Sequence, residues 1–226
     1  MAVSKLILNN FSLLQSLPDD LLENLGKQSN LVEVPRRKVV MEKNQTAHSL
    51  GLLVDGRLQG VDMTLDGREA GLYFIEPNDF FGELSVIDLQ PATEFVISLT
   101  TSRFLMIPSI TIRQLIEQSP QIATVINMRL ARRLRESMQQ RTLLTMPSPI
   151  QRVCAQLIQM TTGEQVVIYA PTHQEIAIMI NTTRETVTRV FQKLQNSGIV
   201  AREGSSLHIK KLKHLTLLAS GEKKEE

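Results

Sequence analysis

The apolar residues of this chain recur with three different patterns, and each pattern predicts a different kind of segment. Between residues 172 and 197 they recur every three to four positions, which is the period of amphipathic helices. Between residues 31 and 107 they fall in short runs separated by turn residues, which predicts strands. Between residues 119 and 145 one apolar stripe runs without a break, which predicts a single long helix.

The segment with helical period contains signals for two helix starts. Thr172 and Glu175 stand at capping-box spacing, in which the hydroxyl and the carboxylate bind free backbone amides. The same spacing recurs at Thr182 and Glu185, so the first helix has only about two turns. Asn181 lies between the helices, and Asn tolerates the left-handed conformation that a tight turn requires. These signals predict a helix-turn-helix.

The second of these helices has one apolar and one polar face. Arg184, Glu185 and Arg189 lie on the polar side, near the helix start. Arg can bond guanine through O6 and N7, and Glu can accept a hydrogen bond from cytosine N4. Because residues near the start of a recognition helix reach base edges, these three are the predicted base-reading residues. A solvated face on an ordinary helical hairpin is the alternative.

This segment resembles the recognition helix of the CRP/FNR transcription regulators. The resemblance rests on Arg-Glu-Thr-Val-Thr-Arg at 184–189 and Gln-Glu-Ile-Ala at 174–177. It covers residues 11–209, with a specific match in the DNA-binding half and a match in outline in the effector-binding half. The Arg-Glu-x-x-x-Arg spacing is similar to the CRP branch, which reads TGTGA-type half-sites; the FNR branch lacks the first Arg. The resemblance implies base reading by Arg184, Glu185 and Arg189, and phosphate contacts by Gln174, Thr183 and Thr188.

The N-terminal part predicts a helix followed by β-structure. Residues 11–28 have a helical pattern, and within them a helix begins at residues 16–20 with Pro18 in its first turn. Strands are predicted at 31–34, 38–41, 49–54, 57–63, 69–75 and 95–107. Short strands separated by Asp-Gly turns favour a sandwich or roll. The resemblance implies the jelly roll of cyclic-nucleotide-binding domains.

A short helix at 109–117 precedes the long one. A helix of this length needs more than one apolar partner, because one short domain covers only part of it. We therefore predict a parallel dimer seam, which is also where the family's dimer helix lies; packing on its own domain is the alternative. The predicted seam residues are Ile122, Ile126, Leu130, Leu134 and Met138.

Met-Pro-Ser-Pro at 146–149 predicts a boundary, since Pro disfavours helix before it and Ser148 can cap a new helix. The rest of the chain predicts a winged helix, with a helix at 150–160, a strand at 166–168 and a hairpin of 199–202 and 207–209. Arg202 and Ser205 are its candidate phosphate contacts. The predicted fold class is α+β. The predicted domains are the effector-binding-type β-roll at 1–118, the dimerisation helix and hinge at 119–146, the winged helix-turn-helix at 147–220 and a disordered tail at 221–226.

Gly82, Glu83 and Leu84 resemble the start of the family's phosphate-binding cassette. In members that bind cyclic AMP, a Glu at the place of Glu83 holds the ribose, and an Arg about ten positions later pairs with the cyclic phosphate. Here Thr93 and Glu94 stand in that region, and no Lys or Arg occurs between residues 84 and 102. Loss of a bidentate Arg pairing removes on the order of 1.5–3 kcal/mol.

The positions that correspond to the adenine side of the family's pocket also differ in part from the family's pattern. Ser137 keeps a hydroxyl whereas Met138 does not, and Arg133 matches a family position near the ribose. We predict that cyclic AMP is not a tight ligand in the usual pose. Gly82 and Glu83 then either hold a turn or serve another effector. The alternative is a regulator that responds to cyclic AMP or cyclic di-GMP through a rearranged pocket; no other cofactor is predicted.

Composition narrows the possible functions. The net charge is only +2, so nucleic-acid binding must rest on a local basic patch, which residues 184–213 supply. The single cysteine, Cys154, excludes an intrachain disulfide and an all-cysteine metal or iron–sulfur site within one chain. Its apolar neighbours predict a buried thiol. His48 alone leaves haem open as a family option.

No apolar run reaches the ~20 residues of a membrane span, and the first residues lack a signal-peptide core, so a cytoplasmic protein is expected. No P-loop, GxGxxG, catalytic triad or metal motif is present, so no enzyme activity is predicted. The predicted partners are double-stranded DNA, a second copy of the chain and RNA polymerase, with no membrane. Two other classes compete with this prediction. One is an enzyme with a nucleotide-binding module, and the other is a sensor that acts only through protein contact and needs no base-reading helix.

Overall fold

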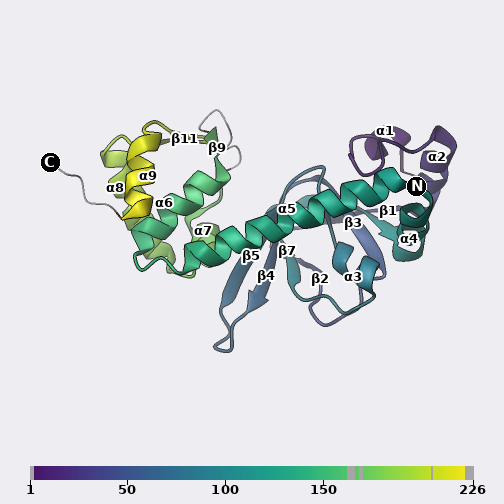
Figure 1. The fold of residues 1–226 in the computed structure, drawn as a ribbon, viewed down its shortest axis with the longest axis horizontal. Coiled ribbons are helices and arrows are strands. Elements are labelled where there is room, and N and C mark those ends of the chain that lie inside the picture. Colours follow the sequence, from purple (N-terminus) through teal and green to yellow (C-terminus); the bar gives the residue numbers. More distant parts are fainter. Residues whose placement is uncertain (1–2, 162–165, 168–169, 205, 222–226) are drawn as a thin grey trace. The chain divides into compact units, whose positions relative to one another are not determined.

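The computed structural model describes residues 3–161, 166–167, 170–204 and 206–221 (Figure 1). The chain divides into two compact units, Met1–Arg68 with Leu72–Glu136 and Glu69–Gly71 with Ser137–Glu226. The division falls inside the long helix α5 (Pro120–Leu144). The predicted fold class is confirmed: a β-roll, a long helix and a C-terminal helix-turn-helix follow one another along the chain.

Two four-stranded sheets form the β-roll. The first has the order β1 (Asn30–Val34), β8 (Ser102–Pro108), β3 (Ser49–Asp55) and β6 (Phe80–Phe81). The second has the order β2 (Val39–Met41), β7 (Phe95–Ser98), β4 (Leu58–Met63) and β5 (Glu69–Ile75). The pairing of β8 with both β1 and β3 is antiparallel and aligns Leu105 with Leu31 on one side and with Leu52 on the other.

The predicted strand at 95–107 is wrong in one respect. It is two strands, β7 and β8, which belong to different sheets. Between them the Ser102 hydroxyl donates a hydrogen bond to the backbone oxygen of Thr100 at 2.9 Å. The apolar pattern continues across the break because both strands face the same core. Strand β6 was not predicted, since two residues are too few to show a period.

The core between the sheets depends on close packing of aromatic rings. Phe81 and Phe104 pack edge to face, with ring centroids 5.5 Å apart. Gly51 leaves room for this pair, because a Cβ at that position would lie only 2.1 Å from Cζ of Phe81. The buried residues of this core are Leu53, Leu58, Ile75, Phe81, Val96 and Phe104.

The N-terminal helix prediction is partly wrong. Helix α1 (Lys5–Leu8) is followed by turns, and α2 (Asp19–Gln28) begins only after Pro18, which is the N-cap. Between the helices the backbone forms turns such as Leu14 N–H to Phe11 O at 2.9 Å. A turn of this kind also spaces apolar residues by three, so Phe11, Leu14 and Leu17 are buried without a helix.

Helix α4 (Ser109–Gln118) and helix α5 lie where the sequence predicts them. Two of the five predicted seam residues are nevertheless already covered. Ile122 and Ile126 are buried in the core that joins the helices to β3 and β8, so they cannot form a seam with a second copy. Leu130 is half-buried against the same core, whereas Leu134 and Met138 are exposed.

The second unit contains α6 (Pro149–Met160), β9 (Val166–Val167), α7 (His173–Met179), α8 (Arg184–Asn196), β10 (Val200–Glu203), β11 (Ser206–Ile209) and α9 (Leu212–Ser220). Its sheet has the order β10-β11-β9. The Ser148 backbone amide binds Gln151 at the start of α6. Helix α9 was not predicted; it packs on α6 and buries Leu215.

Ile168, Ser205 and residues 222–226, which the sequence assigns to a strand, a phosphate contact and a tail, lie outside the described residues. Within the described ranges, no helix combines the length and the hydropathy that crossing a membrane requires.

Candidate nucleic-acid interface and effector pocket

The start of α7 is fixed by a reciprocal pair of hydrogen bonds. The Thr172 backbone amide donates to the Glu175 carboxylate at 2.9 Å, and the Glu175 amide donates to the Thr172 hydroxyl at 3.3 Å. This is the predicted capping box, and it satisfies two amides that a helix start otherwise leaves free. The cap sets where α7 begins, and α7 has only seven residues.

The start of α8 differs from the prediction by one residue. The cap is Thr183, not Thr182: its hydroxyl accepts the Thr186 backbone amide at 3.2 Å. The sequence Thr-Thr offers two hydroxyls, and only the turn before them decides which one caps. That turn contains Asn181 with φ +49°, the left-handed conformation that the sequence predicts there.

Helix α8 presents its two faces as predicted. The buried residues are Val187, Val190, Phe191 and Leu194. Arg184, Glu185 and Arg189 are exposed in the first two turns, and Arg189 Nη2 donates to the Thr186 hydroxyl at 3.3 Å. The hydrogen bond to its own backbone amide lowers the pKa of Glu185, as does the Thr183 hydroxyl. Glu185 is therefore a carboxylate that can only accept hydrogen bonds, which suits a cytosine amino group.

The predicted phosphate-contact residues lie around the same helix. Gln174 and Thr183 are exposed, and Thr188 is half-buried with its hydroxyl bonded to the Arg184 backbone oxygen at 2.9 Å. Arg202 of β10 donates to the backbone oxygen of Ala170 at 3.2 Å. This bond fixes the side chain of Arg202 near the start of α7.

In the β-roll, the predicted pocket residues Glu83 and Arg133 form a buried ion pair. Glu83 begins the short helix α3 (Glu83–Asp88) after Gly82, whose φ of +84° favours glycine. Its Oε1 lies 3.4 Å from Nε of Arg133 on α5, close enough for an ion pair but not aligned as a hydrogen bond. Burial raises the pKa of Glu83, and the charge of Arg133 acts against that rise.

Thr93 and Glu94 belong to the same cluster of side chains as Glu83 and Arg133. One residue that was not among the predicted pocket residues contacts both Glu94 and Arg133. That residue is Tyr73 of β5. The Arg133 guanidinium stacks on the Tyr73 ring, 3.3 Å from its centroid, and the Tyr73 hydroxyl donates to Glu94 Oε1 at 2.6 Å. Thr93 donates to the other oxygen of Glu94. Burial raises the pKa of the Tyr73 phenol, so the hydroxyl keeps the proton that it donates.

Gly60 is the one sequence signal that points to Tyr73. A Cβ at Gly60 would lie 2.5 Å from Cζ of Tyr73, so the glycine makes room for the ring across the sheet. The remaining predicted pocket residues are not part of the cluster. Leu84 is exposed, and Ser137 and Met138 are exposed residues of the second compact unit.

Each half of the chain matches a known domain family. Residues 31–119 match the cyclic nucleotide-binding domain, and residues 151–218 match the Crp-like helix-turn-helix domain. The chain belongs to the CRP/FNR family of transcription regulators.

Relatives of this family member match over most of their length. The CRP-like cAMP-activated global transcriptional regulator of Mycobacterium tuberculosis is 29% identical over 210 residues, which is 90% of this chain and 94% of the relative. FixK2 from Bradyrhizobium japonicum shares the fold with a TM-score of 0.73 at 18% identity, covering 84% of this chain and 96% of FixK2. The c-di-GMP responsive regulator CLP from Xanthomonas campestris shares it with a TM-score of 0.64 at 22% identity, covering 80% and 94%.

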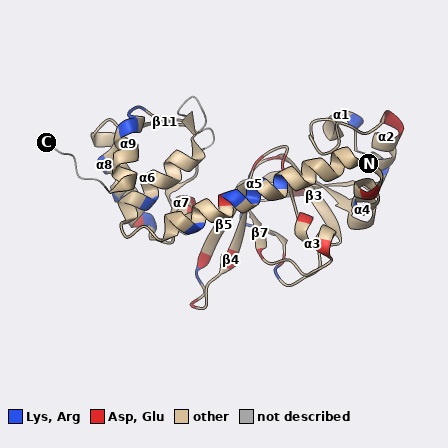
Figure 2. Ribbon diagram, in the orientation of Figure 1, with Lys and Arg blue, Asp and Glu red and all other residues tan. Residues whose placement is uncertain are grey.

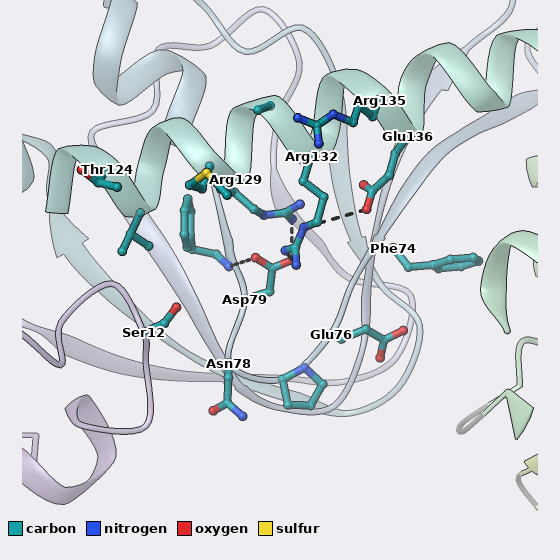
Figure 3. A pocket seen from close by; sticks show the side chains of 15 residues that line it. Ser12, Phe74, Glu76, Asn78, Asp79, Thr124, Arg129, Arg132, Arg135 and Glu136 are labelled. Atoms are coloured by element: carbon teal, nitrogen blue, oxygen red, sulfur yellow. Dashed lines mark hydrogen bonds and ion pairs between the residues drawn. The ribbon is translucent and has the colours of Figure 1, made fainter. Parts of the chain in front are cut away.

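Along α5 of this CRP/FNR protein, the Lys and Arg positions gather near the middle of the helix (Figure 2). Two of them, Arg129 and Arg132, extend toward Asp79 across a groove of about 750 Å³ (Figure 3). Arg129 is buried and pairs with Asp79, and Arg132 Nη2 lies 3.8 Å from the same carboxylate. Asp79 also accepts the Phe80 backbone amide at 2.9 Å. These contacts fasten α5 to the β-roll.

Cys154 is buried in α6, as the sequence predicts. Burial raises the pKa of its thiol to about 12. Because the thiolate is the reactive form of cysteine, this residue packs as a small apolar side chain.

Proposed function

We propose that this CRP/FNR protein is a homodimer that reads TGTGA-type palindromic half-sites through Arg184, Glu185 and Arg189. The observation that carries the proposal is the geometry of α8. Its apolar face is buried, and the three residues are exposed together within its first two turns. Residues at this place on a recognition helix reach base edges in the major groove. A second copy of the chain supplies the second half-site reader.

The test is fluorescence anisotropy of the full chain on a palindrome with two TGTGA-type half-sites, at physiological salt. A scrambled duplex of the same composition is the control, because phosphate contacts alone bind both duplexes equally. We expect a clear preference for the palindrome. Equal affinity for the two duplexes would overturn the half-site assignment while leaving the family and the fold intact.

We further propose that the β-roll does not take cyclic AMP in the usual pose of the family. Three observations support this. Arg133 is held by Glu83 and by the Tyr73 ring. Glu94 is buried at the place where a cyclic phosphate needs a hydroxyl residue, and Thr93 stands where it needs an Arg. A phosphodiester there would meet a second carboxylate, and like charges in a buried site repel strongly.

Titration calorimetry with cyclic AMP tests this proposal separately from DNA binding. We expect no binding at micromolar concentration. Micromolar binding that disappears in Glu83→Ala would show that the ribose contact is used and would overturn the proposal. DNA affinity that does not change on addition of cyclic AMP is the corresponding expectation in the anisotropy experiment.

The alternative function is a regulator that responds to cyclic AMP or cyclic di-GMP through a rearranged pocket. The relatives named above include a cAMP-activated regulator and a c-di-GMP responsive one. For this chain, such a response requires Arg133 to leave Glu83 and turn toward a phosphate. Titration with cyclic di-GMP distinguishes this alternative, since binding that is lost in Arg133→Ala but kept in Arg135→Ala supports it.

A further inference from the structure

His173, which is not among the predicted DNA contacts, is held between the two helices of the helix-turn-helix. It is the first residue of α7, and its ring packs against Phe191 of α8 with centroids 4.6 Å apart and an interplanar angle of 33°. Its Nδ1 lies 2.9 Å from the hydroxyl oxygen of Thr188. The ring is therefore fixed by one aromatic contact and one polar contact, both from the recognition helix.

The hydrogen bonds of Thr188 determine which ring nitrogen carries the proton. The Thr188 hydroxyl donates its hydrogen to the backbone oxygen of Arg184 at 2.9 Å. A hydroxyl has only one hydrogen, so Thr188 must accept from His173, and Nδ1 is the donor. In the neutral ring Nε2 then carries a lone pair. It becomes a donor only when the ring takes up a second proton.

The charges of two cations of the proposed interface act on the ring as well. Partial burial is the main reason that the pKa of His173 is below its ordinary value, and the charges of Arg202 and Arg184 lower it further. The carboxylate on the same helix, Glu175, is directed to the Thr172 amide. In the free protein the ring is therefore largely neutral near pH 7.

We propose that His173 takes up a proton when the protein binds DNA, and that its Nε2–H then binds a backbone phosphate. The inference rests on the proposed function, because it requires α7 and α8 to lie against DNA. A phosphate near the ring favours the charged form, and it also offsets the charges of Arg184 and Arg202 that disfavour it. Both effects raise the pKa of His173 in the complex.

A pKa that rises on binding makes affinity depend on pH. Between the free and the bound pKa of His173, affinity falls as pH rises, by at most about tenfold per pH unit for each protomer. At a pH above both pKa values or below both, the ring has the same charge in the free and the DNA-bound protein. It then contributes nothing to the pH dependence of affinity. The window begins below the ordinary His pKa of about 6.5, because the pKa of His173 is lowered in the free protein, and it ends at the raised pKa of the complex.

The experiment is anisotropy of the full chain on the palindrome and on the scrambled duplex at pH 6, 7 and 8 and constant ionic strength. We expect affinity on the order of fivefold to tenfold higher at pH 6 than at pH 8. The effect should occur on both duplexes, because a phosphate contact carries no sequence information. His173→Gln should remove the slope. His173→Arg should also remove it, but with affinity at pH 8 raised, since its cation is permanent.

His208→Gln is the matched control. His208 lies on β11 in the same unit, 3.5 Å from Glu203, and the pH slope should survive its replacement. His173→Gln could change the slope by disturbing the packing on Phe191. An NMR titration of the His173 ring in the parent protein, with and without duplex, measures its pKa without that disturbance. The pKa of the ring should be higher in the complex.

Each outcome separates the two proposals. A flat pH profile with the palindrome still preferred, or an unchanged pKa of His173 in the complex, overturns the proton linkage alone. A slope that persists in His173→Gln assigns the proton to another group and also overturns it. If neither duplex is preferred but the slope disappears in His173→Gln, half-site reading fails and the linkage stands. Absence of binding to either duplex overturns both.

Discussion

Individual side chains at the start of α8 carry the proposed sequence specificity. Replacing Arg184 or Arg189 by Ala should cost about 1–3 kcal/mol of binding to the palindrome and relax the base preference at one position. The reason is the loss of a bidentate contact to guanine. Anisotropy on single-base variants of the half-site measures both effects. Gln195→Ala, at the exposed far end of α8, is the control and should bind like the parent.

A second prediction for a single side chain concerns the Tyr73 hydroxyl, which donates a hydrogen bond to Glu94 in the β-roll. Tyr73→Phe removes the donor to Glu94 Oε1 and leaves a buried carboxylate oxygen without that partner. We expect the free energy of unfolding to fall by about 1–3 kcal/mol, measured by urea denaturation. In a Glu94→Ala background the same change should cost much less. An equal cost in both backgrounds would mean that the loss comes from packing of the ring alone.

At the scale of elements, the turn between α7 and α8 depends on one left-handed residue. Asn181 has φ +49°, a conformation that costs other L-residues about 1–2 kcal/mol. Asn181→Gly should leave thermal stability nearly unchanged, whereas Asn181→Val should lower it. Asn196→Val, at the last residue of α8 with ordinary helical backbone, is the control. If both Val variants lose the same stability, helix propensity rather than the turn is responsible.

The exposed part of α5 is the element that we expect to hold two copies together. Leu134 and Met138 are more than half exposed, and they lie four residues apart, on one side of the helix. Leu134→Glu should shift the protein toward monomer in sedimentation velocity, because a buried carboxylate in the seam lacks a partner. Met128→Glu is the control: Met128 is equally exposed but lines the groove on another side of α5.

For the whole molecule, the decisive question is whether the β-roll can still serve as a cyclic-nucleotide switch. The double change Thr93→Arg with Glu94→Ser adds a guanidinium and removes a buried carboxylate. We expect cyclic AMP affinity to rise about tenfold to a hundredfold in calorimetry, which corresponds to the 1.5–3 kcal/mol of a charged hydrogen bond. The gain should vanish when Glu83→Ala is added. No gain would mean that Arg133 and Tyr73, not the missing Arg, close the pocket.

The sequence by itself determined the helix-turn-helix, because its signals are local. A capping box at Thr172 and Glu175, a left-handed residue at Asn181 and a period of three to four each act within a few positions of the chain. Even there, the choice of Thr183 over Thr182 as cap depended on the path of the turn. Resemblance to the CRP/FNR family adds the proposed roles of the exposed residues, which local signals do not indicate.

Only the tertiary structure decided what the apolar stripe of α5 covers and what fills the β-roll. A periodic stripe shows that a face is buried but not against what, so Ile122 and Ile126 pack in their own domain rather than in a seam. Tyr73, Arg133 and Glu94 come from segments up to sixty residues apart, and only the packing of α5 against the β-roll brings these side chains together. Burial and pairing, which set the charge of a site, are properties of that packing and have no local sequence signal.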